Sequence, residues 1–109
     1  MQISFTSSKL QKLLSSEKEM VRSFGPKCAK LIKRRLSELN AASDMNQVPP
    51  CTRLHPLTGN LQGKFAVDLE HPKRLILVPD CGELPKKADG SLDLSQIVAI
   101  MILGIVDYH

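Results

Sequence analysis

The sequence predicts an α+β fold in a single domain that spans residues 1–109. Three observations lead to this fold class. Apolar residues first recur at helical spacing, the pattern changes to that of strands after Pro49-Pro50, and the composition, 42% apolar and 24% charged, is typical of a globular protein. A short strand, two helices and four strands with short links favour the order β-α-α-β-β-β-β, with a mainly antiparallel sheet packed against the two N-terminal helices.

The opening strand and the first helix are predicted from residue spacing. Ile3 and Phe5 alternate with polar residues, which is typical of a short strand. Helical spacing follows at Leu10, Leu13 and Leu14. Ser16 and Glu19 form a capping-box pattern, so the helix can restart at this serine and end at Gly25-Pro26.

The second helix begins with Pro26, because proline is favoured at the first helical position. Its apolar stripe consists of Cys28, Ile32, Leu36 and Leu39, and its other faces carry Lys27, Lys30, Lys33, Arg34 and Arg35. Residues 1–50 hold nine Lys/Arg against four Asp/Glu, whereas residues 51–109 hold six against seven. This basic helix is either a solvated face on a core-packing helix or a surface that meets RNA phosphates or an acidic partner.

After a loop over residues 40–51, four segments show strand patterning. They are residues 53–57, 65–70, 74–79 and 97–106, separated by turn residues. The last segment is apolar at every position except Gly104. This predicts a central strand covered on both faces, by helices on one side and by other protein on the second.

Several classes of protein are not favoured. Three cysteines at unrelated spacings indicate free thiols in a reducing cytosol, and hence a cytoplasmic protein. The longest apolar run is shorter than the roughly 20 residues of a membrane span, so no membrane association is expected. The glycines match no phosphate-binding loop, Cys51 with His55 is only half of a zinc site, and the helices lack a helix-turn-helix signature. We therefore expect neither a metal nor a cofactor.

Polar residues suited to RNA cleavage lie at the end of the last strand and in the second. His109 follows the last strand and His55 lies within residues 53–57, so the two could supply the acid and base for attack of a 2′-hydroxyl on the adjacent phosphate. Arg74 would stabilise the phosphorane. Tyr108 could stack on a base, and Asp107 could orient a histidine tautomer. Further candidate cations for phosphate are Arg53, Lys64 and Lys73. The alternatives are a frayed hydrophilic terminus and a histidine packed within a strand.

Four motifs occur in a fixed order along the chain. They are Arg53-Leu54-His55-Pro56-Leu57 with Gly59, Phe65-Ala66-Val67, Arg74-Leu75-Ile76 and Ile105-Val106-Asp107-Tyr108-His109. Nearly end to end, the sequence resembles HigB-type toxins of the RelE-like toxin–antitoxin superfamily, also called plasmid-maintenance or proteic killer proteins. The resemblance implies a RelE-like fold and a small ribonuclease that enters the ribosomal A site, cuts mRNA and is held inactive by a cognate antitoxin. The family's functional residues match His55, Arg74, Asp107, Tyr108 and His109.

One position departs from the family pattern. Thr58 stands where many members carry a lysine before the glycine, and the role of that lysine could pass to Lys64 or Lys73. Two alternatives therefore stay open: a gyrase-poison-like member that acts by binding, and a catalytically weakened binding module or DNA-binding regulator. The basic helix adds Lys27, Lys30 and Arg34 as candidate contacts to RNA phosphates or to an acidic antitoxin.

Overall fold

The computed structural model describes residues 1–107 and confirms the α+β class. The five strands form one sheet in the order β1-β5-β4-β3-β2. The strands are β1 (Gln2–Phe5), β2 (His55–Pro56), β3 (Phe65–Asp68), β4 (Lys73–Pro79) and β5 (Ala99–Asp107), and the helices are α1 (Ser8–Ser15), α2 (Glu17–Phe24) and α3 (Pro26–Ala41). Short 3-10 helices lie at Met45–Gln47, Pro50–Thr52, Gly59–Leu61 and Leu94–Gln96.

Three helices precede β2, whereas two were predicted. The difference arises at Ser16, which is extended (φ −115°) and whose hydroxyl accepts a hydrogen bond from the backbone N–H of Glu19 at 3.3 Å. Such an N-cap begins a new helix, and the restart expected at this serine therefore divides the first predicted helix into α1 and α2. Gly25, at φ +86°, and Pro26 then separate α2 from α3, as the sequence predicts.

The sheet is antiparallel except at one edge. β5 pairs with β4 in antiparallel and with β1 in parallel orientation, so it lies inside the sheet as predicted. Between β4 and β5 the register shifts: Ile76 faces Gly104 and Leu77 faces Ile102, which leaves Leu103 as an extra residue. Gly104 has φ +154°, a backbone angle that favours glycine, and it follows this bulge directly.

The boundaries of the strands differ from the predicted ones. Only two residues of the predicted segment 53–57 pair as β2, and the last strand begins two residues later than expected. β3 ends at Asp68 instead of residue 70, because Leu69 and Lys73 close the turn to β4 with a backbone hydrogen bond of 3.1 Å.

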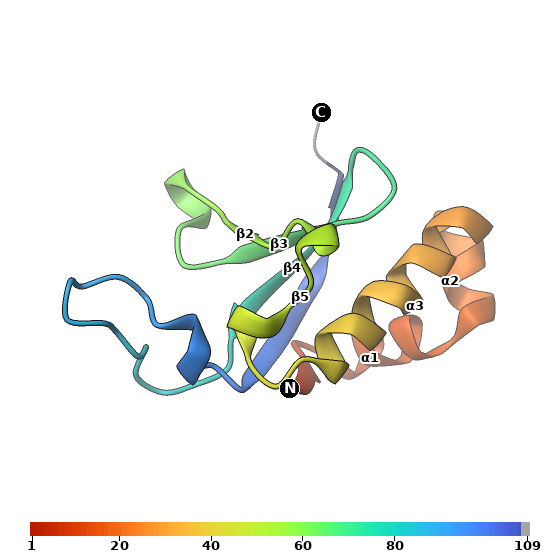
Figure 1. Cartoon of the computed structure of the whole chain (residues 1–109). Helices are drawn as coiled ribbons and strands as arrows, with labels where there is room; N and C mark the ends of the chain where they lie inside the picture. The colour runs from red at the N-terminus through yellow and green to blue at the C-terminus, as the bar shows by residue number, and fades with distance from the viewer. Residues whose placement is uncertain (108–109) are drawn as a thin grey trace.

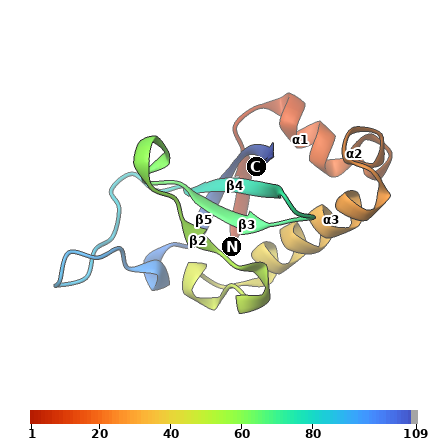
Figure 2. The ribbon, with the colours of Figure 1, turned by 90° about the horizontal axis from the view of Figure 1, so that it is seen from above.

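The core lies between the helices and one face of the sheet. Leu75, Leu77, Ile100 and Ile102 are fully buried there, in one cluster with Ile32 of α3. Figures 1 and 2 show the helices on one side of the molecule, while the β2–β3 connection and residues 80–98 project on the other side. None of the helices within residues 1–107 is both long and apolar enough to cross a membrane.

β5 is covered on one face within this chain. Its residues alternate, so that Ile100 and Ile102 are buried, whereas Met101 and Leu103 are half-buried and Val106 is exposed. The sequence predicted that helices cover one face of this strand and that another protein covers the second. The structure confirms the cover by helices. Cover of the second face, which we call the open face of the sheet, stays a prediction.

Candidate active site

The open face carries a shallow pocket where β2, β3 and β4 meet. Arg53, Leu54, His55, Asp68 and Arg74 line this hollow of about 440 Å³. The strand register explains their meeting: His55 pairs with Ala66, and Asp68, two residues further along β3, pairs with Arg74. Because side chains two residues apart in a strand share a face, all these polar groups point to the same side.

Two arginines lie on either side of one carboxylate in this pocket. Arg53 Nε is 3.4 Å from Asp68 Oδ2, and Arg74 Nε is 3.3 Å from Asp68 Oδ1. The Arg53 side chain is 77% exposed, against 36% for Arg74 and 30% for Asp68. The site therefore presents two guanidinium groups toward solvent, which suits an anionic ligand such as phosphate.

The ring of His55 is oriented by a backbone carbonyl. Its Nδ1 lies 2.7 Å from the carbonyl oxygen of Arg53. A carbonyl oxygen can only accept, so Nδ1 carries the proton and a neutral ring keeps its lone pair on Nε2. Arg53 itself is left-handed (φ 56°, ψ 40°), an uncommon conformation for a residue other than glycine. Such backbone strain is concentrated at functional sites.

A polar chain from α3 supports the pocket from the helix side. Arg35 donates from Nε to the backbone carbonyl of Asp68 at 2.9 Å and from Nη1 to Glu38 Oε1 at 2.8 Å. The Cys51 thiol contacts the other oxygen of Glu38 at 3.3 Å. Burial by itself would raise the pKa of Glu38, but hydrogen bonds from Arg35 and Cys51, with the charges of Arg35 and Arg34, hold that pKa below its ordinary value. Glu38 is thus ionised at neutral pH.

Asp68 and Glu38 were absent from the sequence-based candidates, and Arg35 was named only as one of the cations on the outer faces of the second predicted helix, whereas its side chain is 12% exposed. The sequence did contain evidence for Asp68. It is a polar residue on the face of β3 that alternation assigns to solvent, and the next strand begins with Lys-Arg. The evidence for Arg35 was weaker: it lies beside the apolar stripe of α3 and not opposite it, which indicates partial burial of its side chain.

The other predicted cations of the strand region lie outside the pocket. Lys64 precedes β3 and lines a smaller hollow of about 160 Å³ on the open face, together with Ile76 and Val106. Lys73 pairs in register with Asp107, and alternation from Arg74 puts both on the helix face. Tyr108 and His109 lie outside the described residues.

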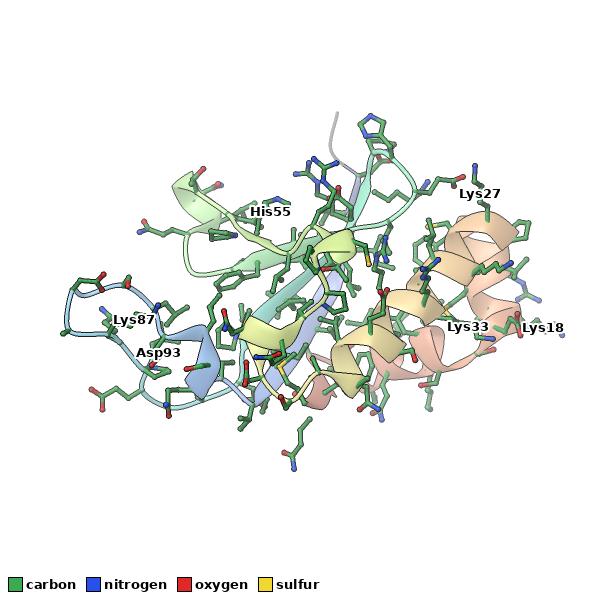
Figure 3. The ribbon with its side chains drawn as sticks, in the orientation of Figure 1. Lys18, Lys27, Lys33, His55, Lys87 and Asp93 are labelled. Carbon is green, nitrogen blue, oxygen red and sulfur yellow. The ribbon has the colours of Figure 1, made fainter. Side chains whose placement is uncertain are left out.

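The basic helix is a separate region. The exposed side chains of Lys27 and Arg34 form ion pairs with Glu70 (3.8 Å) and Glu38 (3.9 Å), and Lys30 is exposed on the same helix. Figure 3 shows His55 on one side of the sheet and Lys27 and Lys33 on the helix side. The structure therefore separates the predicted phosphate contacts of α3 from those around His55.

The cysteines are free thiols within the described chain, as predicted. Cys28 is buried, which raises the pKa of its thiol, whereas Cys51 and Cys81 are exposed. No group of three or more His, Cys, Asp and Glu side chains among residues 1–107 is arranged to hold a metal ion.

Comparison with solved structures gives a match over the whole chain. The YoeB-YefM complex from Staphylococcus aureus contains a chain that superposes with a TM-score of 0.54 at 16% identity, covering 100% of this chain and 97% of that one. No protein-family model matches the sequence. No curated protein matches it either. The likeness to YoeB confirms the RelE-like fold that the sequence predicts.

Proposed function

We propose that this protein is the toxin of a type II toxin–antitoxin system, a metal-independent endoribonuclease that cuts mRNA on the ribosome. The observation that carries the proposal is the pocket in which His55 Nε2 is available as a base beside two arginines. The fold adds support, because YoeB is a toxin of the RelE superfamily and its structure is that of a complex with YefM. A cognate antitoxin is accordingly the partner we infer. Within the superfamily, the ordered motifs favour the HigB type, and a cytoplasmic location follows from the proposed substrate.

The chemistry assigns a role to each residue. His55 Nε2 accepts the proton of the 2′-hydroxyl, whose oxygen attacks the adjacent phosphate. The guanidinium of Arg74, with Arg53 beside it, stabilises the additional negative charge of the phosphorane. His109 protonates the leaving 5′-oxygen, and Tyr108 holds the neighbouring base or phosphate. Asp107, which lies on the helix face and not in the pocket, orients His109 from that side. The bond from phosphorus to the 5′-oxygen breaks and a 2′,3′-cyclic phosphate forms, so the step needs no external reactant.

The remaining cations serve in binding. Lys64 lines another hollow together with Thr58, so we assign it the role of the lysine that Thr58 replaces. Lys73 points to the helix face and suits a neighbouring stretch of RNA. The cations of α3, on the opposite side of the sheet, suit ribosomal RNA or an acidic antitoxin: Lys27, Lys30 and Arg34.

A binding module without catalysis is the second candidate. Two observations favour it: Thr58 replaces a phosphate-neutralising lysine, and Asp68 partly neutralises both arginines of the pocket. Such a protein would arrest growth by occupying its target, as gyrase poisons do, and mRNA would stay intact.

Expression without antitoxin tests the proposal. The wild type, His55→Gln, His109→Ala and the control His71→Gln are induced, and mRNA 5′ ends are mapped on translating ribosomes. We expect new 5′ ends with the wild type and with His71→Gln, since His71 is exposed in the β3–β4 turn, and loss of cleavage in the other two. Absence of cleavage by the wild type would refute the ribonuclease, and DNA breaks in its place would favour the gyrase poison. An mRNA with a single 2′-deoxy nucleotide at the cut site should resist cleavage.

A further inference from the structure

The carboxylate of Asp68 is the anion that both arginines of this pocket face. It lies between Arg53 and Arg74 with one oxygen toward each guanidinium. Oδ1 is buried and has no hydrogen-bond partner among the described residues, so its approach to Arg74 is a charge contact without hydrogen-bond geometry. A carboxylate that serves only to hold two arginines would normally accept charge-assisted hydrogen bonds of about 2.7–2.9 Å.

We propose that Asp68 is an internal counter-ion that an RNA phosphate displaces from the two arginines. Asp68 thereby sets the affinity and the salt dependence of the pocket for RNA. The proposal rests on the proposed function in taking RNA as the ligand, but it concerns binding and not cleavage.

The geometry favours displacement over a structural role for the carboxylate. The backbone of Asp68 is held independently, because its carbonyl accepts the 2.9 Å hydrogen bond from Arg35 and its strand pairs with β4. The side chain contacts the arginines only at 3.3 and 3.4 Å, through Nε in each case. A phosphate carries more negative charge and can accept two parallel N–H bonds from a guanidinium. When a phosphate replaces the Asp68 carboxylate as the partner of the two arginines, the backbone contacts that hold β3 therefore stay intact.

The charge of the pocket predicts the effect of neutralising Asp68. The two arginines and Asp68 together carry one net positive charge, and Asp68→Asn raises it to two. One unit charge at roughly 5 Å from a bound phosphate, in a largely aqueous setting, changes affinity on the order of 5-fold. One further cation available to phosphate steepens the dependence of log Kd on log salt by about 0.7 for single-stranded RNA.

Binding of a fully 2′-O-methylated RNA oligonucleotide, measured by fluorescence anisotropy without ribosomes, tests this inference. We expect Asp68→Asn to bind several-fold tighter than the wild type and to lose affinity more steeply with salt. Glu83→Gln, which removes the same charge from an exposed position in residues 80–98, is the matched control and should leave both quantities near wild type. Equal or weaker binding by a folded Asp68→Asn, including no measurable binding by either protein, overturns the proposal.

A double-mutant cycle separates displacement from general electrostatics. If Asp68 competes with phosphate for Arg53, then Arg53→Gln should weaken binding more in the Asp68→Asn background than in the wild type. Additive effects would contradict the proposal. Asp68→Ser provides a second neutral side chain should the asparagine variant fold poorly. Because the probe cannot be cleaved, tighter binding by Asp68→Asn with no mRNA cleavage in cells would leave this inference standing while the ribonuclease proposal fails.

Discussion

Arg35 joins the helix layer to the pocket, so its replacement by methionine should destabilise the whole domain. The change removes hydrogen bonds to the carbonyl of Asp68 and to Glu38, whose side chain is only 18% exposed. Breaking a fully buried ion pair costs about 3–5 kcal/mol, and partial access of water to Glu38 reduces this to about 2–3 kcal/mol. For a domain of this length, such a loss lowers Tm by roughly 10–15 °C.

Urea and thermal unfolding measure this loss, and Arg34→Met is the matched control. Arg34 lies on the same helix and faces the same carboxylate at 3.9 Å, but its side chain is 68% exposed. Its replacement should cost below about 0.5 kcal/mol, because exposed ion pairs contribute little. Equal losses in the two variants would refute the reasoning. Combining Arg35→Met with Glu38→Gln should recover about 1 kcal/mol, since no half-buried carboxylate is then left without its partner.

The pH dependence gives the same prediction an independent check. Burial raises the pKa of Glu38, yet the hydrogen bonds and charges around it lower that pKa further than burial raises it. A carboxyl whose pKa is lower in the folded than in the unfolded chain stabilises the fold above the unfolded value, about 4.3, and this contribution is lost as the pH falls through the folded pKa. The difference between the wild type and Arg35→Met should therefore be complete at pH 7 and shrink below about pH 4.

Three further predictions concern the scaffold. Gly104→Ala should cost about 1–2 kcal/mol in urea unfolding, although a Cβ there would meet nothing within 4 Å, because φ +154° is strained for any other residue; an unchanged midpoint would contradict this backbone conformation. A thiol reagent should modify Cys51 and Cys81 in the native protein and reach Cys28 only on unfolding, and equal rates for all three would contradict the burial of Cys28. Ser16→Ala should cost about 1 kcal/mol through loss of the α2 N-cap, and no change would show that the helix break does not depend on its hydroxyl.

Local patterns predicted the elements of the fold well. Helical spacing, the Gly25-Pro26 stop and the strand patterning of residues 65–70 and 74–79 each depend on a few residues, and the structure has helices and strands there. The number of helices depended on the cap at Ser16, which the sequence indicated as a restart without deciding whether the helix would continue through it. The sequence also indicated that helices cover only one face of β5, but which residues of β5 lie on that face depends on the placement of helices distant in sequence.

The pocket was predictable in part. Arg53, His55 and Arg74 were candidates, and the structure brings them to one hollow. Their meeting with Asp68 depends on the register of β2, β3 and β4, which is set by tertiary packing and not by neighbouring residues. Arg35 contacts Asp68 because α3 lies against the end of β3, so its position beside the apolar stripe could indicate burial but not this partner. The catalytic roles of His55 and Arg74, like those of Asp107, Tyr108 and His109, stay predictions.

The composition of the pocket narrows the kind of reaction it can support. Among residues 1–107 its lining holds a histidine and two arginines but no serine, threonine or cysteine that could act as a nucleophile, and Asp68 faces the arginines. This described lining favours a reaction whose nucleophile comes from the substrate or from water. RNA carries such a group, the 2′-hydroxyl, next to the phosphate that the arginines would bind. A shallow open pocket of this kind suits a polymer that supplies its own nucleophile better than a small molecule that must be enclosed.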